Sequence, residues 1–90
     1  MNVDPIKVEE LIKRLKSMTE ETTNKQKQLK GFITNLQQSW NDAHYQSFII
    51  QFQEFDKKMM RTLEDANTVM LPHLKNVKKL AEDYKNLGRK

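Results

Sequence analysis

The segment Leu36-Gln37-Gln38-Ser39-Trp40-Asn41-Asp42-Ala43 lies just before the middle of the 90-residue chain and contains its only tryptophan. A helical pattern of apolar residues leads up to this segment, and a second such pattern leads away from it. Asn41 and Asp42 are the strongest turn formers between the two patterns, because their side chains can hydrogen-bond to nearby backbone groups. The sequence therefore predicts a helical hairpin whose turn is formed by Trp40, Asn41 and Asp42.

The first predicted helix covers residues 5 to about 39. Asp4 is a favoured N-cap residue, and Pro5 is favoured at the first helical position. Apolar residues then recur at alternating steps of three and four, which marks one face of a helix and is close to a heptad seam. Thr22 and Lys25 interrupt this face near its middle. Its apolar residues are Val8, Leu11, Leu15, Met18, Leu29, Phe32 and Leu36.

The second predicted helix covers residues 43 to about 87, with Asn41 or Asp42 as its N-cap. Its apolar face is broader than a strict seam, which is typical of a helix that packs on more than one neighbour. Pro72 predicts a kink or a break, because proline removes a backbone hydrogen bond from a helix. The residues of this face are Tyr45, Phe48, Ile49, Phe52, Phe55, Met59, Met60, Leu63, Ala66, Val69 and Met70.

The chain is too small for one pair of helices to bury much apolar surface. Small scaffolds of this size usually depend on disulfides, a metal ion or self-association. The sequence has no cysteine, and His44 and His73 are far apart without further ligands at helical spacing. We therefore expect no metal or cofactor and an all-α hairpin that dimerises into a four-helix bundle.

No pattern typical of an enzyme is present in the sequence. It lacks a nucleophile elbow, a glycine-rich phosphate loop and a His-Glu-x-x-His zinc motif. The adjacent carboxylates at Glu9-Glu10, Glu20-Glu21 and Glu64-Asp65 fall on the polar faces of the predicted helices. The sequence therefore predicts a non-enzymatic protein.

The net charge of +4 comes entirely from the last nineteen residues, because the first 71 carry ten basic and ten acidic side chains. This basic segment is either a solvated helix face or a contact for an acidic partner or an anionic membrane surface. Nucleic-acid binding is disfavoured, because the helices are too long for a helix-turn-helix and Asp42 occupies the turn. The sequence also has no apolar run of the length of a membrane span or of a cleaved secretory signal.

The segment from Leu29 to Phe55 resembles the WXG-hundred (ESAT-like) family of type VII secretion proteins. Members of that family are about one hundred residues long and have two long helices joined by a Trp-x-Gly turn. A serine before the tryptophan and an aromatic residue eight positions after it, here Ser39 and Phe48, are typical of the family. Asp42 replaces the glycine; aspartate can cap the second helix, and Asn41 tolerates a left-handed backbone.

The resemblance implies an antiparallel dimer, either of two copies or with a related hairpin protein. It also implies a secreted effector or an export partner, delivered to a membrane secretion ATPase and secreted without a cleaved signal peptide. Exported members commonly carry a tyrosine followed four positions later by an acid; here Tyr84, the candidate export or partner contact, is followed by Gly88. The alternatives are a cytoplasmic adaptor or structural bundle without its own export signal, or a basic bundle that binds nucleic acid or anionic membrane.

The sequence predicts two groups of site residues, one in the turn and one along the apolar faces of the helices. Trp40, with Asn41 and Asp42, forms the turn motif, and we expect its indole to belong to the core at the end of the hairpin. The second group is the stripe expected to form the core and the dimer contact. Its members are Leu11, Leu15, Met18, Leu29, Phe32, Leu36, Phe48, Phe52, Phe55, Met59 and Leu63.

Overall fold

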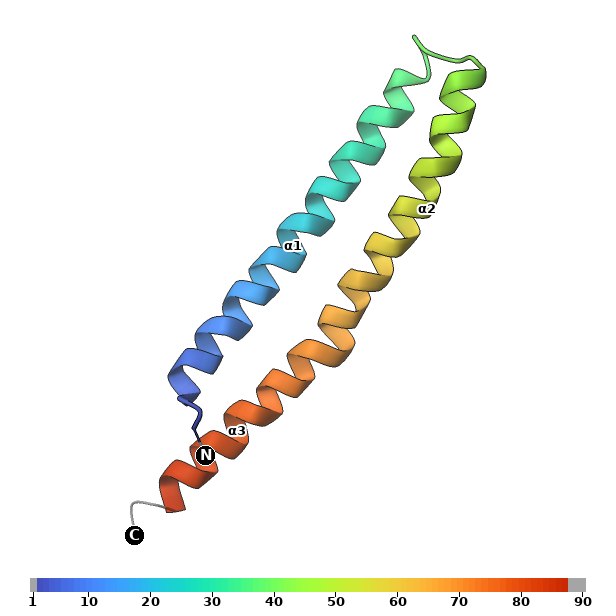
Figure 1. Cartoon of the computed structure of the whole chain (residues 1–90). Coiled ribbons are helices and arrows are strands. Elements are labelled where there is room, and N and C mark those ends of the chain that lie inside the picture. Colours follow the sequence, from blue (N-terminus) through green and yellow to red (C-terminus); the bar gives the residue numbers. More distant parts are fainter. Residues whose placement is uncertain (1, 88–90) are drawn as a thin grey trace.

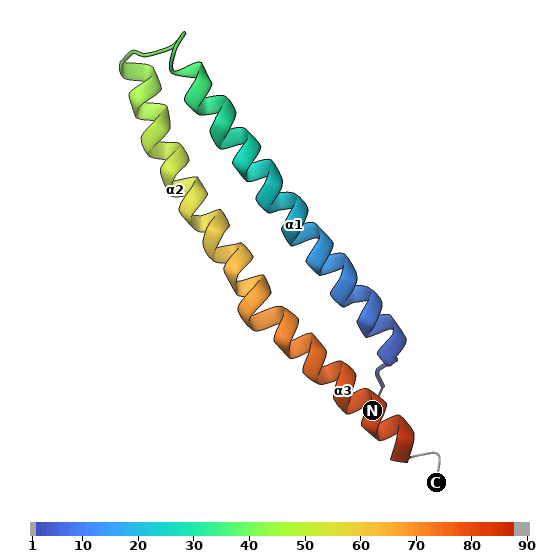
Figure 2. The same ribbon diagram turned by 180° about the vertical axis from the view of Figure 1, so that it is seen from behind.

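The computed structural model describes residues 2–87, which form two long helical arms joined by a short turn (Figure 1). The first arm is α1 (Pro5–Leu36); the second consists of α2 (Ala43–Asp65), the π-helical turn η1 (Ala66–Met70) and α3 (Leu71–Leu87), which follow one another without a gap. The view from behind shows the second arm running back along α1, with the start of the chain beside α3 (Figure 2). The predicted all-α helical hairpin is confirmed.

Aspartate side chains cap the start of both arms. The Oδ1 atom of Asp4 accepts a hydrogen bond from the Ile6 backbone N–H at 2.9 Å. The Oδ1 atom of Asp42 accepts one from the Tyr45 N–H at 3.0 Å. Each bond satisfies a backbone donor that has no partner within the helix. Of the two candidate caps for the second arm, the structure uses Asp42.

The helix α1 ends at Leu36, three residues before the predicted boundary. After this residue the backbone forms tighter turns, in which each N–H bonds to the carbonyl three residues earlier. The Gln38 N–H donates to the Asn35 carbonyl at 3.2 Å, and the Ser39 N–H donates to the Leu36 carbonyl at 3.0 Å. Such tight turns are common at helix ends. No glycine or proline marks this end in the sequence, which explains the error in the predicted boundary.

The second arm continues through Pro72 instead of breaking there. The Leu71 N–H bonds to the carbonyl of Ala66, five residues earlier, which makes the turn before the proline wider than in an α-helix. In a regular α-helix the proline ring would clash with the carbonyl four residues before it. The wide turn of η1 relieves this conflict, and the arm bends through this stretch while remaining helical (Figure 1).

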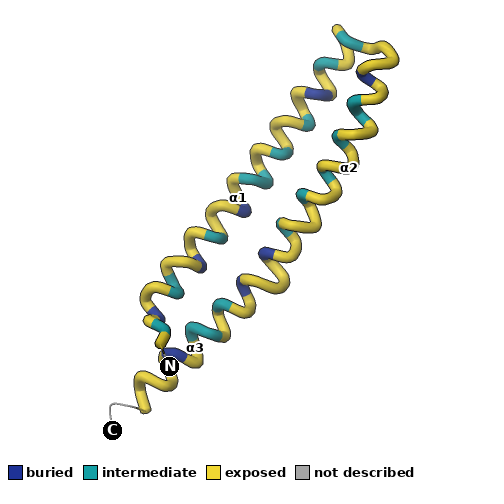
Figure 3. Tube along the Cα trace, in the orientation of Figure 1, coloured by how far each residue is buried: buried dark blue, intermediate teal, exposed yellow. Residues whose placement is uncertain are grey.

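The core is a thin line of residues between the two arms (Figure 3). On α1 it follows Ile12, Thr19 and Ile33, which are spaced by seven or fourteen residues and lie beside the predicted stripe. Sequence reasoning missed Ile12 and Ile33. Among the described residues no large side chain is fully buried. The buried apolar residues are Ile12, Ile33, Tyr45, Ala66, Leu71 and Ala81.

The hairpin is a rod rather than a compact body. Its extents are 71 × 17 × 15 Å and its radius of gyration is 20.2 Å, whereas a compact chain of this length has a radius of gyration of about 12 Å. Its accessible surface is 7330 Å², against about 5,500 Å² for a compact protein of this mass. A single hairpin therefore leaves unusually much of its surface exposed.

Candidate interaction surfaces

Trp40 packs at the tip of the hairpin on two aromatic residues of α2. Its ring lies edge-on to Tyr45, with centroids 5.3 Å apart, and stacks on Phe48 at 6.3 Å. The indole N–H donates a hydrogen bond to Asp42 Oδ1 at 3.0 Å. Trp40 is half-buried in this arrangement. It therefore covers the turn without being enclosed by it.

Asp42 joins the two sides of this turn through a single oxygen atom. Its Oδ1 accepts hydrogen bonds from both the Tyr45 backbone and the Trp40 indole. Between residues 2 and 87 no residue has a positive φ angle, so neither Asn41 nor Asp42 takes a left-handed conformation. The turn therefore does not need the glycine of the Trp-x-Gly pattern, and Asp42 supplies a cap in its place.

We predict that Asp42→Ala lowers the free energy of unfolding by about 1–2 kcal/mol, because it removes both hydrogen bonds. Asp42→Asn retains an acceptor oxygen and should cost clearly less. Urea unfolding followed by circular dichroism measures both values. Equal losses in the two variants would show that the negative charge, and not the acceptor atom, is what the turn requires.

Tyr45 links the tip of the hairpin to α1. It is only 4% exposed, and its hydroxyl donates a hydrogen bond to the Ile33 carbonyl oxygen at 3.3 Å. The contact joins residues twelve positions apart, across the turn. Tyr45 thus joins the two arms at this end in two ways, through its buried ring and through the hydrogen bond of its hydroxyl.

One side of the rod carries a long row of exposed apolar side chains, which we call the apolar flank. It is defined by Leu11, Met18, Leu29 and Phe32 of α1 and Phe55 of α2, all of which are exposed. Phe32 is 65% exposed and Met18 is 58% exposed. Half-buried members of the predicted stripe adjoin the row: Leu15, Leu36, Phe48, Phe52 and Met59.

The two arms meet on the apolar flank in a shallow apolar groove of about 170 Å³. The groove is lined by Leu29, Phe52, Phe55 and Met59, together with Thr22, Lys25 and Gln26. The rings of Phe48, Phe52 and Phe55 follow one another along α2, with successive centroids 6.1 and 6.0 Å apart. The aromatic row that begins at Trp40 thus runs into the groove.

A second hollow between the two arms has both apolar and charged residues in its lining. Leu63, a member of the predicted stripe, lines it together with Met60, Lys27 and Lys30. Asp56 bridges the two arms: its Oδ2 pairs with Lys30 Nζ at 2.8 Å, and its Oδ1 accepts a hydrogen bond from Gln26. The hydrogen bonds from Lys30 and Gln26 lower the pKa of Asp56 below its ordinary value of 3.8.

We predict that this bridge makes part of the stability sensitive to acid. Because the folded state lowers the pKa of Asp56, its contribution is present above pH 3.8, the ordinary value, and is lost as the pH falls through the lower folded value. Asp56→Asn should therefore lower the free energy of unfolding at pH 7 and make it fall less steeply below pH 4. Urea unfolding across this pH range measures the difference. Parallel pH profiles for the two proteins would contradict the assignment.

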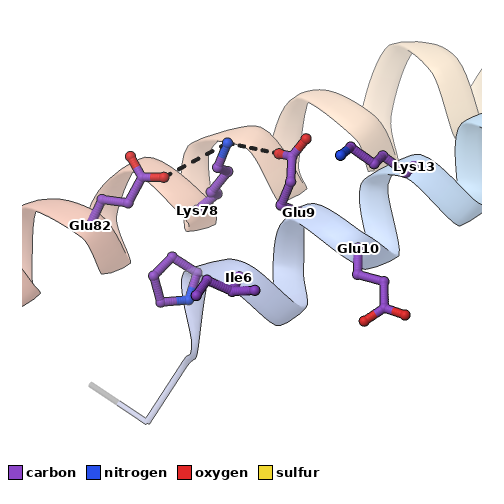
Figure 4. Close-up of a pocket in the computed structure, with 7 residues that line it drawn as sticks. Ile6, Glu9, Glu10, Lys13, Lys78 and Glu82 are labelled. Carbon is purple, nitrogen blue, oxygen red and sulfur yellow. Dashed lines mark ion pairs between the residues drawn. The ribbon is translucent and has the colours of Figure 1, made fainter.

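A second bridge joins the arms at the open end of the hairpin (Figure 4). Lys78 Nζ of α3 lies 2.7 Å from a carboxylate oxygen of Glu9 in α1 and 3.7 Å from one of Glu82. The hydrogen bond from Lys78 lowers the pKa of Glu9, and the same bond raises the pKa of Lys78. Tyr84 lies near this end and is 59% exposed, while Gly88 falls outside the described residues.

Within residues 2–87 no group of three acidic, histidine or cysteine side chains could hold a metal ion. The helices of this part of the chain also include none with the length and apolar character to span a membrane. In comparisons with known proteins, no family model, no curated protein and no solved structure matches the chain.

Proposed function

We propose that this chain is a non-enzymatic subunit that pairs through its apolar flank with a second helical hairpin and acts by protein–protein contact. The observation that carries the proposal is the apolar flank itself. Five large apolar side chains are exposed along one side of a rod whose own core is thin. Exposed apolar side chains gathered along one side of a soluble protein, rather than scattered singly, mark an interaction site.

The exposed area suits a stable pair of chains. The hairpin exposes about 1,800 Å² more than a compact protein of its mass. Standard interfaces bury about 800 Å² on each partner, and obligate dimers bury about 1,000–2,500 Å² on each. Pairing along one flank would bring the exposed surface per residue into the ordinary range.

The shape of the flank favours a second copy of this chain as the partner. From Leu11 to Phe32 it extends about 32 Å along α1, which only an elongated partner can cover. Its polar interruption, Thr22 and Lys25, lies near the middle of α1. A reversed second copy would place Leu11 near Phe32 of its partner and the two polar segments near each other. The result is a four-helix bundle.

We propose type VII secretion as the setting, on the strength of the Trp40 turn between two long amphipathic arms. In this setting the dimer, or a pair with a related hairpin, is a secreted effector or an export partner that a membrane ATPase recognises. It leaves the cell without a cleaved signal peptide. Tyr84, exposed near the open end, is the candidate residue for that contact.

The test is to express the tagged chain in its native cells with the secretion ATPase intact or inactivated. We expect the protein in the culture medium only when the ATPase is intact, and Tyr84→Ala should reduce its export. Retention in the cytosol under both conditions would overturn the secretion assignment. Retention together with a single co-purifying partner would support a cytoplasmic adaptor instead.

A further inference from the structure

The hairpin fold concentrates the positive charge of the chain at its open end. Residues 20–65, which form the half containing the turn, carry six basic and seven acidic side chains. The described residues of the open end, 2–19 and 66–87, carry eight basic and five acidic side chains. Both arms contribute to this surplus, since residues 2–19 carry four basic and three acidic side chains.

Five lysines of this end line one groove between α1 and α3, which we call the lysine groove. Its volume is about 450 Å³, and buried Ile12 contributes to its wall. The lysines are Lys13, Lys16, Lys75, Lys78 and Lys79. A neighbouring hollow of about 530 Å³ adds Pro5, Ile6 and Glu10 (Figure 4). It shares Glu9, Lys13, Lys78 and Glu82 with the groove. Ile6 is 72% exposed.

Most of the positive charge of the groove is not neutralised within the hairpin. The two carboxylates that line it, Glu9 and Glu82, both contact Lys78 (Figure 4). Across residues 2–87, the other four lysines have no carboxylate within 4.0 Å. Four ammonium groups thus surround a concave site whose apolar lining residue is Ile12.

We propose that the lysine groove binds an acidic amphipathic segment of another protein. Its carboxylates would pair with Lys13, Lys16, Lys75 and Lys79, and its apolar side chains would pack on Ile6 and Ile12. The contact of Lys78 with Glu82, at 3.7 Å, is loose enough for an incoming carboxylate to replace it. Complementary charge of this kind provides specificity and a fast association rate.

The groove fits a peptide better than other polyanions. Glu9 and Glu82 stand among the lysines and would repel the closely spaced phosphates of a nucleic acid. A flat anionic bilayer would meet the rims of a concave groove but not Ile12, which is buried in its wall. A peptide can place an apolar side chain there and direct its carboxylates to the rims.

This site lies on the side of α1 away from the apolar flank. At 100° per residue, Glu9, Lys13 and Lys16 lie about 140–180° around the helix from Leu11 and Met18. Pairing of two hairpins would therefore leave the lysine groove accessible. The inference goes beyond the proposed dimer, and either can fail without the other.

The test titrates the full chain into a fluorescein-labelled peptide of leucine and glutamate at helical spacing, with binding followed by anisotropy. The double variant Lys13→Glu/Lys75→Glu is compared with Lys27→Glu/Lys57→Glu, which changes the net charge equally but lies outside the groove. We expect about tenfold or greater weakening by the groove variant and less than about twofold by the control. The same peptide with glutamine in place of glutamate should not bind.

Circular dichroism and the mass in solution show whether each variant remains folded and paired. If the groove variant unfolds, Lys13→Gln/Lys75→Gln takes its place and should still weaken binding more than Lys27→Gln/Lys57→Gln. Equal weakening by groove and control variants would overturn the proposal, because it would indicate a response to net charge alone. Tighter binding to a DNA duplex, or to vesicles of phosphatidylcholine and phosphatidylglycerol, would also overturn it.

Discussion

Phe32→Glu is expected to convert the protein from a dimer to a monomer. Phe32 is 65% exposed in the single hairpin and lies on the apolar flank. Pairing would bury the new carboxylate without a partner charge, at a cost of several kcal/mol. Because the core of one hairpin is thin, the monomer should also lose helix content and melt at a lower temperature. Sedimentation equilibrium and thermal unfolding by circular dichroism measure these effects.

Ile50→Glu is the matched control for this experiment. Ile50 is 66% exposed, about the same as Phe32, but it precedes Phe55 by five residues and lies about 140° from it around α2. The flank does not include it. We therefore expect an unchanged mass and nearly unchanged stability. Equal disruption by the two substitutions would show that the apolar flank is not the pairing surface.

Tyr45→Ala is expected to cost about 3–5 kcal/mol of unfolding free energy, as truncation of a buried aromatic residue usually does. Tyr45 is 4% exposed, packs on Trp40 and is hydrogen-bonded to the Ile33 carbonyl. Tyr45→Phe removes only the hydroxyl and should cost about 0.5–1.5 kcal/mol. Urea unfolding at a fixed protein concentration gives both values, because the stability of a dimer depends on concentration.

A loss below about 1 kcal/mol for Tyr45→Ala would contradict this assignment. It would indicate that the tip frays independently of the rest of the hairpin. Trp40→Ala should cost less than Tyr45→Ala, because Trp40 is only half-buried. The reverse order would identify the tryptophan as the main anchor of the tip.

The features that depend on local sequence were predictable. The cap at Asp4 follows from the preference of aspartate for the residue before a helix and is confirmed; Asp42, one of the two candidates for the second arm, caps α2. The position of the turn follows from the change of pattern around Trp40. These features require no knowledge of how the two arms are aligned.

The alignment of the two arms was not predictable from the sequence. Apolar residues at steps of three and four on α1 form two neighbouring lines, and the sequence alone does not indicate which line faces the second arm. The structure places Ile12 and Ile33 inward and leaves Met18 and Phe32 exposed. The bridges from Asp56 and Lys78 join residues distant in the chain, so no local pattern predicts them.

The turn before Pro72 shows a different limit of sequence reasoning. A proline within a helical pattern predicts a disturbance but not its form. Here the backbone forms one π-helical turn, in which the Leu71 N–H bonds to the Ala66 carbonyl, and the arm remains helical through the proline. Leu71 and Ala81 are buried, and α3 packs against α1, which holds the last segment in place.

The molar mass of the purified chain in solution is the decisive measurement of pairing through the apolar flank. Sedimentation equilibrium over a range of concentrations should give twice the 10.7 kDa of one chain, falling to one chain for Phe32→Glu but not for Ile50→Glu. A fully helical species of 10.7 kDa at every concentration, with a melting temperature independent of concentration, would contradict it.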